Sequence, residues 1–236
     1  MKVIDNNVRG VPMRFAGYTR SLELCSRMNY ETENLDFIDE MTPGEVMFDL
    51  GACEGRFSIY ASKKGIKCYS FEPETNNFEA LLQNLALNDI KDELKPFKLA
   101  IGKENGSAKL KIGQPWAGGH QKVVEQQETR EDLRFDFKEE QVIDVVSLDR
   151  FLEDHQIACP DYLKVDIDGS EMAFLQGAQA TLKNTGLKSI IFELEINDKN
   201  FQYIMDNLAE NGFREKARFQ VPNEPFLFNI IFTRDR

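Results

Sequence analysis

The feature that most constrains this chain is a short glycine-bearing turn between an apolar run and an amphipathic segment. The run Val46-Met-Phe48 leads into Asp49-Leu-Gly-Ala-Cys-Glu-Gly55 and then into Arg56-Phe-Ser-Ile-Tyr-Ala61. Twenty-one residues beyond Gly51, a second apolar run also ends on an acid, Glu72. Glycines let a ligand approach the main chain closely, and an acid at the tip of the next strand suits a ribose diol. The pattern predicts a strand, a turn and a helix that hold a nucleoside-type cofactor.

A dinucleotide is the obvious rival for this cofactor. Its binding turn needs glycines in the pattern G-x-G-x-x-G, but counting from Gly51 places Cys53 and Arg56 where the second and third glycines belong. The second glycine lets a pyrophosphate touch the main chain, and a cysteine side chain obstructs that approach. The remaining glycines, Gly51 and Gly55, fit a cofactor without phosphates, or only shape a tight turn between strand and helix.

The charge at the turn indicates the sign of the ligand. Asp49 and Glu54 lie next to the glycines, and carboxylates repel phosphate but attract positive charge. S-adenosylmethionine carries a sulfonium and an ammonium group, so it meets this description. We therefore expect S-adenosyl-L-methionine as the cofactor.

Composition narrows the class of partner and the compartment. The 236 residues include 40 acids and 29 bases, for a net charge of −11, which disfavours binding to a nucleic-acid backbone. Four cysteines occur without a C-x-x-C pair, as in reduced cytosolic proteins. Neither an apolar signal core nor a run of membrane-spanning length is present in the sequence. We expect a cytoplasmic protein without a transmembrane segment.

The order of predicted elements indicates an α/β fold. Strand and helix patterns alternate, which predicts a mainly parallel sheet covered on both faces. We expect a helical N-terminal extension over residues 1–42, with a helix at 33–41, and one catalytic domain over residues 43–236. Residues 113–140 break the regular pattern, so we expect a lid or a substrate-binding insertion there, or else mobile surface.

Several further strands are predicted from apolar runs and turn residues. A third strand is expected to end near residues 99–102, followed by a hairpin that turns at Asn105-Gly106. The last two predicted strands, 213–219 and 226–232, are expected to form an antiparallel pair at or near a sheet edge. Strands 161–166 and 189–193 lie between these groups in the sequence.

Five sequence blocks occur in a recognisable order along the chain. They are Met47-Phe-Asp-Leu-Gly-Ala-Cys-Glu-Gly55, Phe71-Glu-Pro73 with Asn84 and Asn88, Val146-Ser-Leu-Asp149, Leu163-Lys-Val-Asp-Ile-Asp-Gly-Ser-Glu171 and Ile191-Phe-Glu193. Taken together, these blocks resemble the FkbM family of S-adenosylmethionine-dependent methyltransferases over roughly residues 33–212. The resemblance implies the class I methyltransferase fold, a Rossmann-like three-layer sandwich around a seven-stranded, mostly parallel sheet with a reversed final strand. Members of the family mostly methylate hydroxyl oxygens on sugars, glycans or polyketide-type natural products.

The resemblance also implies which residues hold the cofactor. Asp49 and the turn from Gly51 to Gly55 would hold its methionine end, and Glu72 its ribose hydroxyls. The family commonly has asparagine at the position of Cys53, so one polar contact is lost there, while binding through backbone groups should survive. The expected cofactor-binding set is Asp49, Gly51, Ala52, Cys53, Gly55, Glu72, Pro73 and Ala100.

Catalytic groups in an open α/β sheet gather beyond the carboxyl ends of its strands. Lys164 and Asp166 share one face of a predicted strand, and Asp168 follows in the next turn. We expect Asp166 to touch the cofactor or the acceptor, Asp168 or Glu193 to act as base, and Lys164 to neutralise the acids or orient the acceptor. The alternative for Asp168 is a helix N-cap with Glu171 three residues on.

Other roles for these acids and for the 113–140 segment stay open. Asp166, Asp168 and Glu193 offer hard oxygens that suit magnesium, but their spacing is not diagnostic, and no metal is assigned. His120 would serve as base if a lid folds inward, and is otherwise a solvated loop residue. Trp116 either stacks on a sugar or anchors the lid.

The sequence is compatible with three classes of function. A methyltransferase acting on a small-molecule or glycan hydroxyl is preferred. A catalytically silent binding protein of the same fold and a nicotinamide-dependent oxidoreductase are the alternatives. The sequence leaves open the acceptor, oxygen or nitrogen as the methylated atom, and the oligomeric state.

Overall fold

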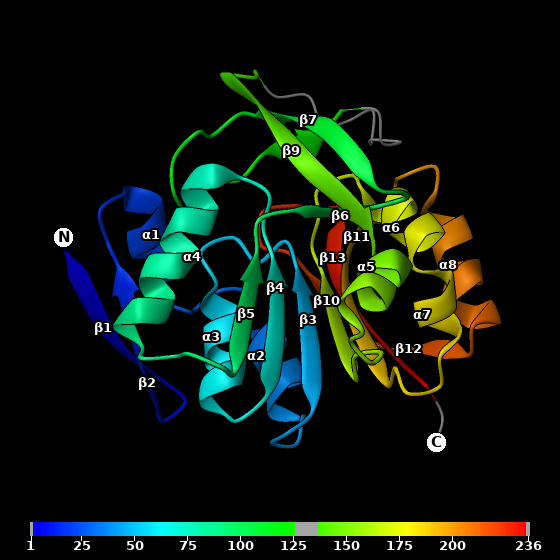
Figure 1. Cartoon of the computed structure of the whole chain (residues 1–236), viewed down its shortest axis with the longest axis horizontal. Coiled ribbons are helices and arrows are strands. Elements are labelled where there is room, and N and C mark those ends of the chain that lie inside the picture. Colours follow the sequence, from blue (N-terminus) through cyan, green and yellow to red (C-terminus); the bar gives the residue numbers. More distant parts are fainter. Residues whose placement is uncertain (1, 126–135, 235–236) are drawn as a thin grey trace.

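The computed structural model describes residues 2–125 and 136–234, and its centre is a seven-stranded sheet (Figure 1). Strand β13 runs antiparallel to both of its neighbours, whereas the strand pairs from β11 to β5 are parallel. This arrangement confirms the predicted sheet with a reversed final strand and the predicted antiparallel edge pair. The strands, in spatial order, are β12 (Phe213–Gln220), β13 (Leu227–Arg234), β11 (Ser189–Glu195), β10 (Tyr162–Val165), β3 (Val46–Leu50), β4 (Lys67–Phe71) and β5 (Leu94–Phe97).

The sheet is buried on both faces because its strands alternate apolar side chains between two cores. In β3, Met47 packs into one core and Phe48 into the other, and both are fully buried. One core includes residues of α2 (Thr32–Asp39), α3 (Arg56–Lys63) and α4 (Thr75–Leu87). The other includes residues of α5 (Leu148–His155), α6 (Glu171–Gly177), α7 (Gln179–Lys183) and α8 (Phe201–Glu210).

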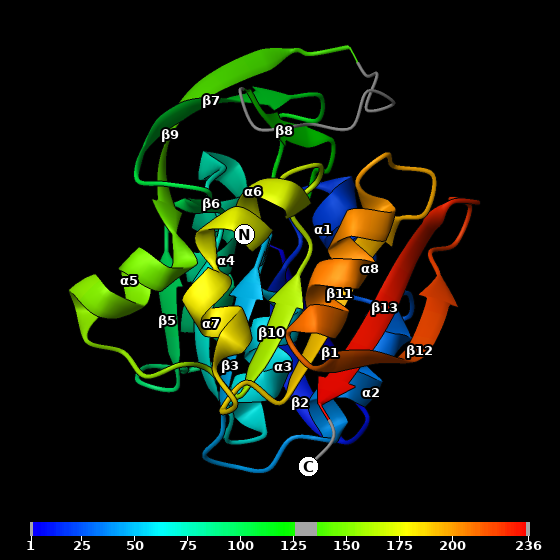
Figure 2. The ribbon, with the colours of Figure 1, turned by 90° about the vertical axis from the view of Figure 1, so that its right-hand side faces the viewer.

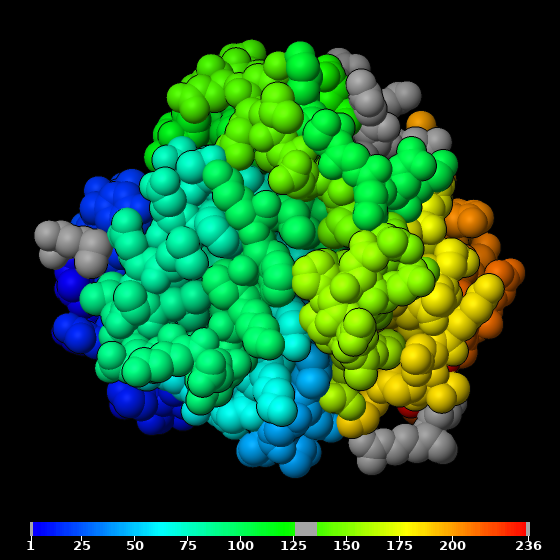
Figure 3. Space-filling model, viewed as in Figure 1, coloured from blue at the N-terminus to red at the C-terminus, as the bar shows by residue number. Residues whose placement is uncertain are grey.

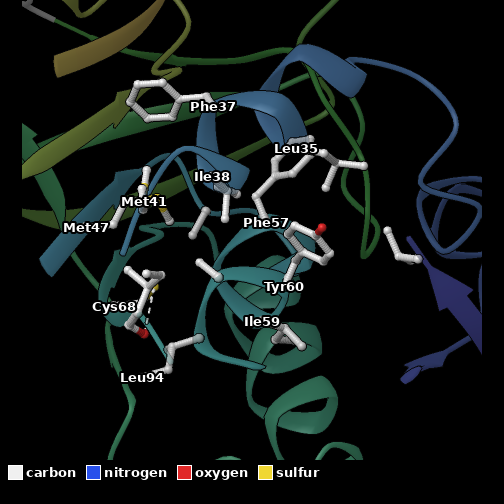
Figure 4. Packing of buried hydrophobic residues seen from close by; sticks show 14 of the residues in the cluster. Leu35, Phe37, Ile38, Met41, Met47, Phe57, Ile59, Tyr60, Cys68 and Leu94 are labelled. Atoms are coloured by element: carbon white, nitrogen blue, oxygen red, sulfur yellow. Dashed lines mark hydrogen bonds between the residues drawn. The ribbon is translucent and has the colours of Figure 1, made fainter. Parts of the chain in front are cut away.

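Helix α2 confirms the helix predicted near residues 33–41 and packs against α3 (Figure 4). Leu35 and Ile38 of α2 lie beside Phe57 and Tyr60 of α3 in the same buried cluster. The Tyr60 hydroxyl donates a 2.7 Å hydrogen bond to Asp39 at the end of α2. This contact joins the segment before the first sheet strand to the helix that follows the glycine turn.

The N-terminal extension is only partly helical. It begins with the antiparallel hairpin of β1 (Val3–Val8) and β2 (Val11–Ala16), followed by α1 (Arg20–Cys25). Side chains in α4 and at its C-terminal end hold the hairpin, because the Ala16 amide donates to Asn84 Oδ1 at 2.8 Å and the Arg14 amide donates to Asn88 Oδ1 at 2.9 Å. Hydrogen bonds from a strand to side chains of a helix leave no trace in the pattern of apolar residues, so this hairpin was not predicted.

A second, four-stranded sheet corrects two predictions. The third strand of the main sheet, β5, ends at Phe97, and residues Ala100–Gly102 form β6 of the second sheet instead. The predicted hairpin at Asn105-Gly106 is wrong, because β6 pairs parallel with β9 and β7 pairs antiparallel with β9 and β8. The strands are ordered β6 (Ala100–Gly102), β9 (Glu139–Ser147), β7 (Gly106–Ile112) and β8 (Lys122–Val124).

The second sheet lies beyond the carboxyl ends of the parallel strands (Figure 2). Its side chains form a prominence at the top of the molecular surface in the view of Figure 3. Residues 113–125 and 136–140 belong to this region, and the rest of the predicted 113–140 insertion lies outside the described residues. Across residues 2–125 and 136–234, no helix combines the length and apolarity needed to cross a membrane.

Candidate active site

A cavity of about 1200 Å³ opens at the carboxyl ends of β3, β4, β10 and β11, next to the second sheet. Turns of the main domain and part of the second sheet line it. Ligands in open α/β sheets bind at this edge, because the connections there are free to vary while the sheet holds them in place. The lining segments include residues 50–54, 71–73, 119–122, 166–168 and 221–227.

The glycine turn after β3 owes its shape to left-handed backbone. Gly51 has φ of 81° and Gly55 has φ of 84°, and a Cβ atom at Gly51 would lie 1.7 Å from the carbonyl oxygen of Asp166. The turns after β3 and β10 therefore meet backbone to backbone, which only glycine permits. Cys53 also has positive φ, at 51°. Gly51, Ala52 and Cys53 line the cavity, whereas Gly55 lies behind them against Leu81.

Glu72 ties the glycine turn to the tip of β4. Its carboxylate is buried and accepts 2.9 Å hydrogen bonds from the Cys53 and Glu74 amides. Burial raises the pKa of Glu72 to about 7, and the two backbone donors offset only part of that effect. Glu72, Pro73 and Ala100 all line the cavity, which gathers three of the predicted cofactor-binding residues at one end.

Lys164 is a buried charge held between two carboxylates. Because β10 and β3 are parallel neighbours, Lys164 lies beside Asp49, and its Nζ is 3.3 Å from Asp49 Oδ1 and 3.1 Å from Asp166 Oδ2. Burial opposes the charge, but Asp166 and Asp49 outweigh it and raise the pKa of Lys164 above its usual range. Asp49 also accepts a 2.5 Å hydrogen bond from Ser58 Oγ. Lys164 lines the cavity, and Asp49 lies behind it.

Three carboxylates meet where β10 and β11 end. One oxygen each of Asp166, Asp168 and Glu193 lies within 4.8 Å of the other two. Burial raises the pKa of Glu193 well above its usual range, and the charges of Asp166, Glu31 and Asp168 add to the effect. A carboxylate with a raised pKa is a stronger proton acceptor than an ordinary one, and the three oxygens are also of the type that a divalent cation binds.

The alternative role for Asp168 as a helix cap does not fit. Helix α6 begins after Ser170, and no side-chain hydrogen bond caps it there. Glu171 instead accepts a 2.8 Å hydrogen bond from the Gly169 amide and so fixes the turn that carries Asp168. Asp168 itself has left-handed backbone, with φ of 37°, and lines the cavity.

Tyr30 and Glu31 of the N-terminal extension also line the cavity, although neither was predicted as a site residue. Glu31 has positive φ, at 52°, where α2 begins, and its carboxylate pairs with Arg56. The Arg56 guanidinium lies 4.0 Å from the centre of the Tyr30 ring. These contacts join residues 25 or more positions apart, which no local spacing can reveal.

The two candidate residues of the 113–140 segment take different positions. His120 lines the cavity at an exposed position. Trp116 Nε1 donates a 2.9 Å hydrogen bond to Ser21 Oγ, and Lys138 lies 5.1 Å from the centre of its ring. Trp116 therefore anchors this segment to the N-terminal extension, which agrees with the second of its two predicted roles.

Comparison with known proteins agrees with this geometry. The sequence model of the Methyltransferase FkbM domain matches residues 49–215, which confirms the resemblance. Solved structures share the fold at low identity, among them methyltransferase FkbM from Methylobacillus flagellatus KT, at 16% identity and a TM-score of 0.53 over 80% of this chain. This chain covers 43% of that protein, so it spans less than half of its length. No curated protein matches the chain.

Two further methyltransferase structures are similar over most of both chains. Precorrin-6y C5,15-methyltransferase from Geobacter metallireducens GS-15 is 11% identical with a TM-score of 0.55, over 94% of each chain. Ribosomal protein L11 methylase from Lactobacillus delbrueckii subsp. bulgaricus is 16% identical with a TM-score of 0.52, over 86% of this chain and 77% of that one. At these identities the likeness concerns the fold.

Proposed function

The chain belongs to the FkbM methyltransferase family and its cofactor is S-adenosyl-L-methionine; we propose that it methylates a hydroxyl oxygen of a sugar, glycan or natural-product acceptor. One observation carries the proposal: Asp166, Asp168 and Glu193 gather in the same cavity as the glycine turn. A hydroxyl is a weak nucleophile, so its methylation gains from a base close to the acceptor.

The cavity end around the glycine turn fits the cofactor. Glu72 is placed to accept hydrogen bonds from the ribose hydroxyls, with Pro73 and Ala100 along the adenosine. Gly51, Ala52 and Cys53 present main chain to the methionine part. The cofactor, when bound, supplies a methyl group on a positively charged sulfur that leaves as a neutral thioether.

Next to the glycine turn, we assign the carboxylates to orienting and activating the acceptor. Asp166 is held by Lys164 at 3.1 Å, and Lys164 is held in turn by Asp49, so we assign this chain of charges to positioning. Glu193 has the raised pKa that a proton acceptor needs, and we assign it as the base. Asp168 then orients the acceptor. Alignment of acceptor and methyl donor can contribute several kcal/mol of the rate enhancement.

Cofactor affinity is expected to depend on pH through Glu72. The ionised Glu72 carboxylate accepts hydrogen bonds from both ribose hydroxyls, so the cofactor binds the ionised form more tightly. At a pH where Glu72 of the free protein is protonated, binding therefore releases a proton. With a pKa of about 7, the Kd for S-adenosylmethionine should be about tenfold higher at about pH 6 than at about pH 8. Calorimetric titration across this range measures it. Glu72→Ala should weaken binding and remove the pH dependence of the Kd. A wild-type Kd that does not change with pH would contradict the contact between Glu72 and the ribose.

The proposed reaction is tested with a panel of acceptors. We expect methyl ethers from hydroxyl-bearing sugars or natural products, identified by NMR, with rates unchanged by EDTA because the base and Lys164 need no metal ion. Methyl groups found on nitrogen would overturn the oxygen assignment. A rate lost in EDTA and restored by Mg²⁺ would assign the three carboxylates to a metal. Cofactor binding without product from any acceptor would favour the catalytically silent alternative.

A further inference from the structure

Arg56, the first residue of α3, is a buried cation, and one of its guanidinium nitrogens lacks a hydrogen-bond partner among the described residues. Its side chain is held flat, 4.0 Å from the centre of the Tyr30 ring and 4.4 Å from that of Phe57. One terminal nitrogen, Nη2, donates to Glu31, and Nε lies 3.7 Å from Glu54 Oε1. The other terminal nitrogen, Nη1, has no hydrogen-bond partner within the described residues, although only 7% of Arg56 is exposed.

An unused buried guanidinium nitrogen needs an explanation. A buried donor without a partner costs about 1–3 kcal/mol, and more when it is charged. Arg56 lines the cavity together with Tyr30, Glu31 and Phe57, directly after the glycine turn. Helix α3 also begins here, and the partial positive charge of a helix N-terminus adds to that of the guanidinium. Both features favour an anionic group of a ligand at this end of the cavity.

The acids around Arg56 limit what kind of ligand fits. Glu54 is 2% exposed and neither of its carboxylate oxygens has a hydrogen-bond partner among the residues described. With Glu31, two carboxylates therefore surround one guanidinium, so a free anion such as phosphate would be repelled. A zwitterion is neutral and brings an ammonium for the acids with a carboxylate for the guanidinium. An α-amino acid group is such a zwitterion.

We propose that the Arg56 guanidinium binds the α-carboxylate of the methionine part of S-adenosylmethionine, with the ammonium directed to the acidic side formed by Glu54 and Glu31. Arg56 is thereby a positioning residue that sets where the methyl group lies in the cavity. Tyr30 and Glu31 orient its guanidinium from the N-terminal extension. A purely structural Arg56 would only fasten that extension to the glycine turn.

Decarboxylated S-adenosylmethionine separates these two roles, because it lacks only the α-carboxylate. We expect the wild-type protein to bind S-adenosylmethionine about 10- to 100-fold more tightly than the decarboxylated compound, as for a hydrogen bond between charged groups. Arg56→Met should bind both compounds with the same weak affinity. Arg14→Met removes a cation from an exposed ion pair on β2 and should keep the wild-type preference.

Binding of 5′-methylthioadenosine shows whether the adenosine site is intact, since this compound lacks the amino acid group entirely. Its affinity should be the same for wild type and Arg56→Met. If Arg56→Met does not fold, Arg56→Lys replaces it. A single ammonium should not bind Glu31 and the ligand carboxylate as well as a guanidinium does, so the preference for S-adenosylmethionine over the decarboxylated compound should fall. An unchanged preference in the folded variant, no preference in the wild type, or equal losses for all three compounds would overturn the proposal. All readouts are binding, so they do not depend on the acceptor.

Discussion

Replacing Glu193 with glutamine is expected to lower kcat by about 10²- to 10⁴-fold while the affinity for S-adenosylmethionine stays unchanged. Glutamine has nearly the same shape but cannot take the proton of an acceptor hydroxyl. Glu193 lies among Asp166, Asp168 and Glu31, whose charges add to burial in raising its pKa. The substitution therefore removes a carboxylate whose surroundings raise its affinity for a proton. Steady-state kinetics with the acceptor identified by product analysis measure the effect.

The pH profile separates a lost base from a damaged site. A base acts in its deprotonated form, so wild-type kcat should fall as the pH drops through the raised pKa of Glu193. The kcat of Glu193→Gln should not show this decrease. Glu215→Gln, at an exposed ion pair on the edge strand β12, should behave as the wild type. A Glu193→Gln variant with wild-type kcat contradicts the assignment. If Asp168→Asn is then slow, the base is Asp168.

Replacing Gly51 with alanine is expected to abolish cofactor binding and to cost several kcal/mol of unfolding free energy. The added Cβ would lie 1.7 Å from the Asp166 carbonyl oxygen, and that oxygen belongs to backbone, which cannot swing aside. The glycine turn and the turn that carries Asp166 must separate, which moves two neighbouring parts of the cavity wall. Left-handed backbone adds about 1–2 kcal/mol for a residue with a side chain.

Gly10→Ala is the matched control for this substitution. Gly10 also has positive φ, at 88°, but a Cβ there meets no atom within 4 Å. It therefore carries the backbone cost without the collision, and should lose only about 1–2 kcal/mol and bind the cofactor normally. Denaturant unfolding and calorimetric titration give both quantities. Equal destabilisation of the two variants would contradict the close contact between the turns.

Local sequence predicted the parts of the fold that local chemistry decides. The helix that became α2 and the final antiparallel pair of β12 and β13 follow apolar periodicity and clear turn residues. Asn105-Gly106 is a strong hairpin signal, yet the chain there connects β6 and β7, two strands that flank β9 rather than each other. The partner of a strand is a tertiary choice, and a turn signal alone does not determine it.

In the candidate site, too, local sequence predicted some residues, whereas long-range contacts placed others. Glu72, Asp166, Asp168 and Glu193 were found because each lies near the carboxyl end of a strand, at the edge of the sheet. Glu31 was missed because its place in the cavity depends on a contact with Arg56, 25 positions away, and on left-handed backbone at the start of α2. Other predictions still await experiment, including the domain boundary at residue 43 and the cytoplasmic location.

The proposed reaction depends on where the cofactor lies relative to the carboxylates, and a crystal structure with S-adenosylhomocysteine measures this directly. We predict that the ribose contacts Glu72, the α-carboxylate contacts Arg56, and the sulfur faces the space in front of Glu193 and Asp166. Binding of S-adenosylhomocysteine elsewhere, or with its sulfur directed away from Glu193 and Asp166, would contradict the account.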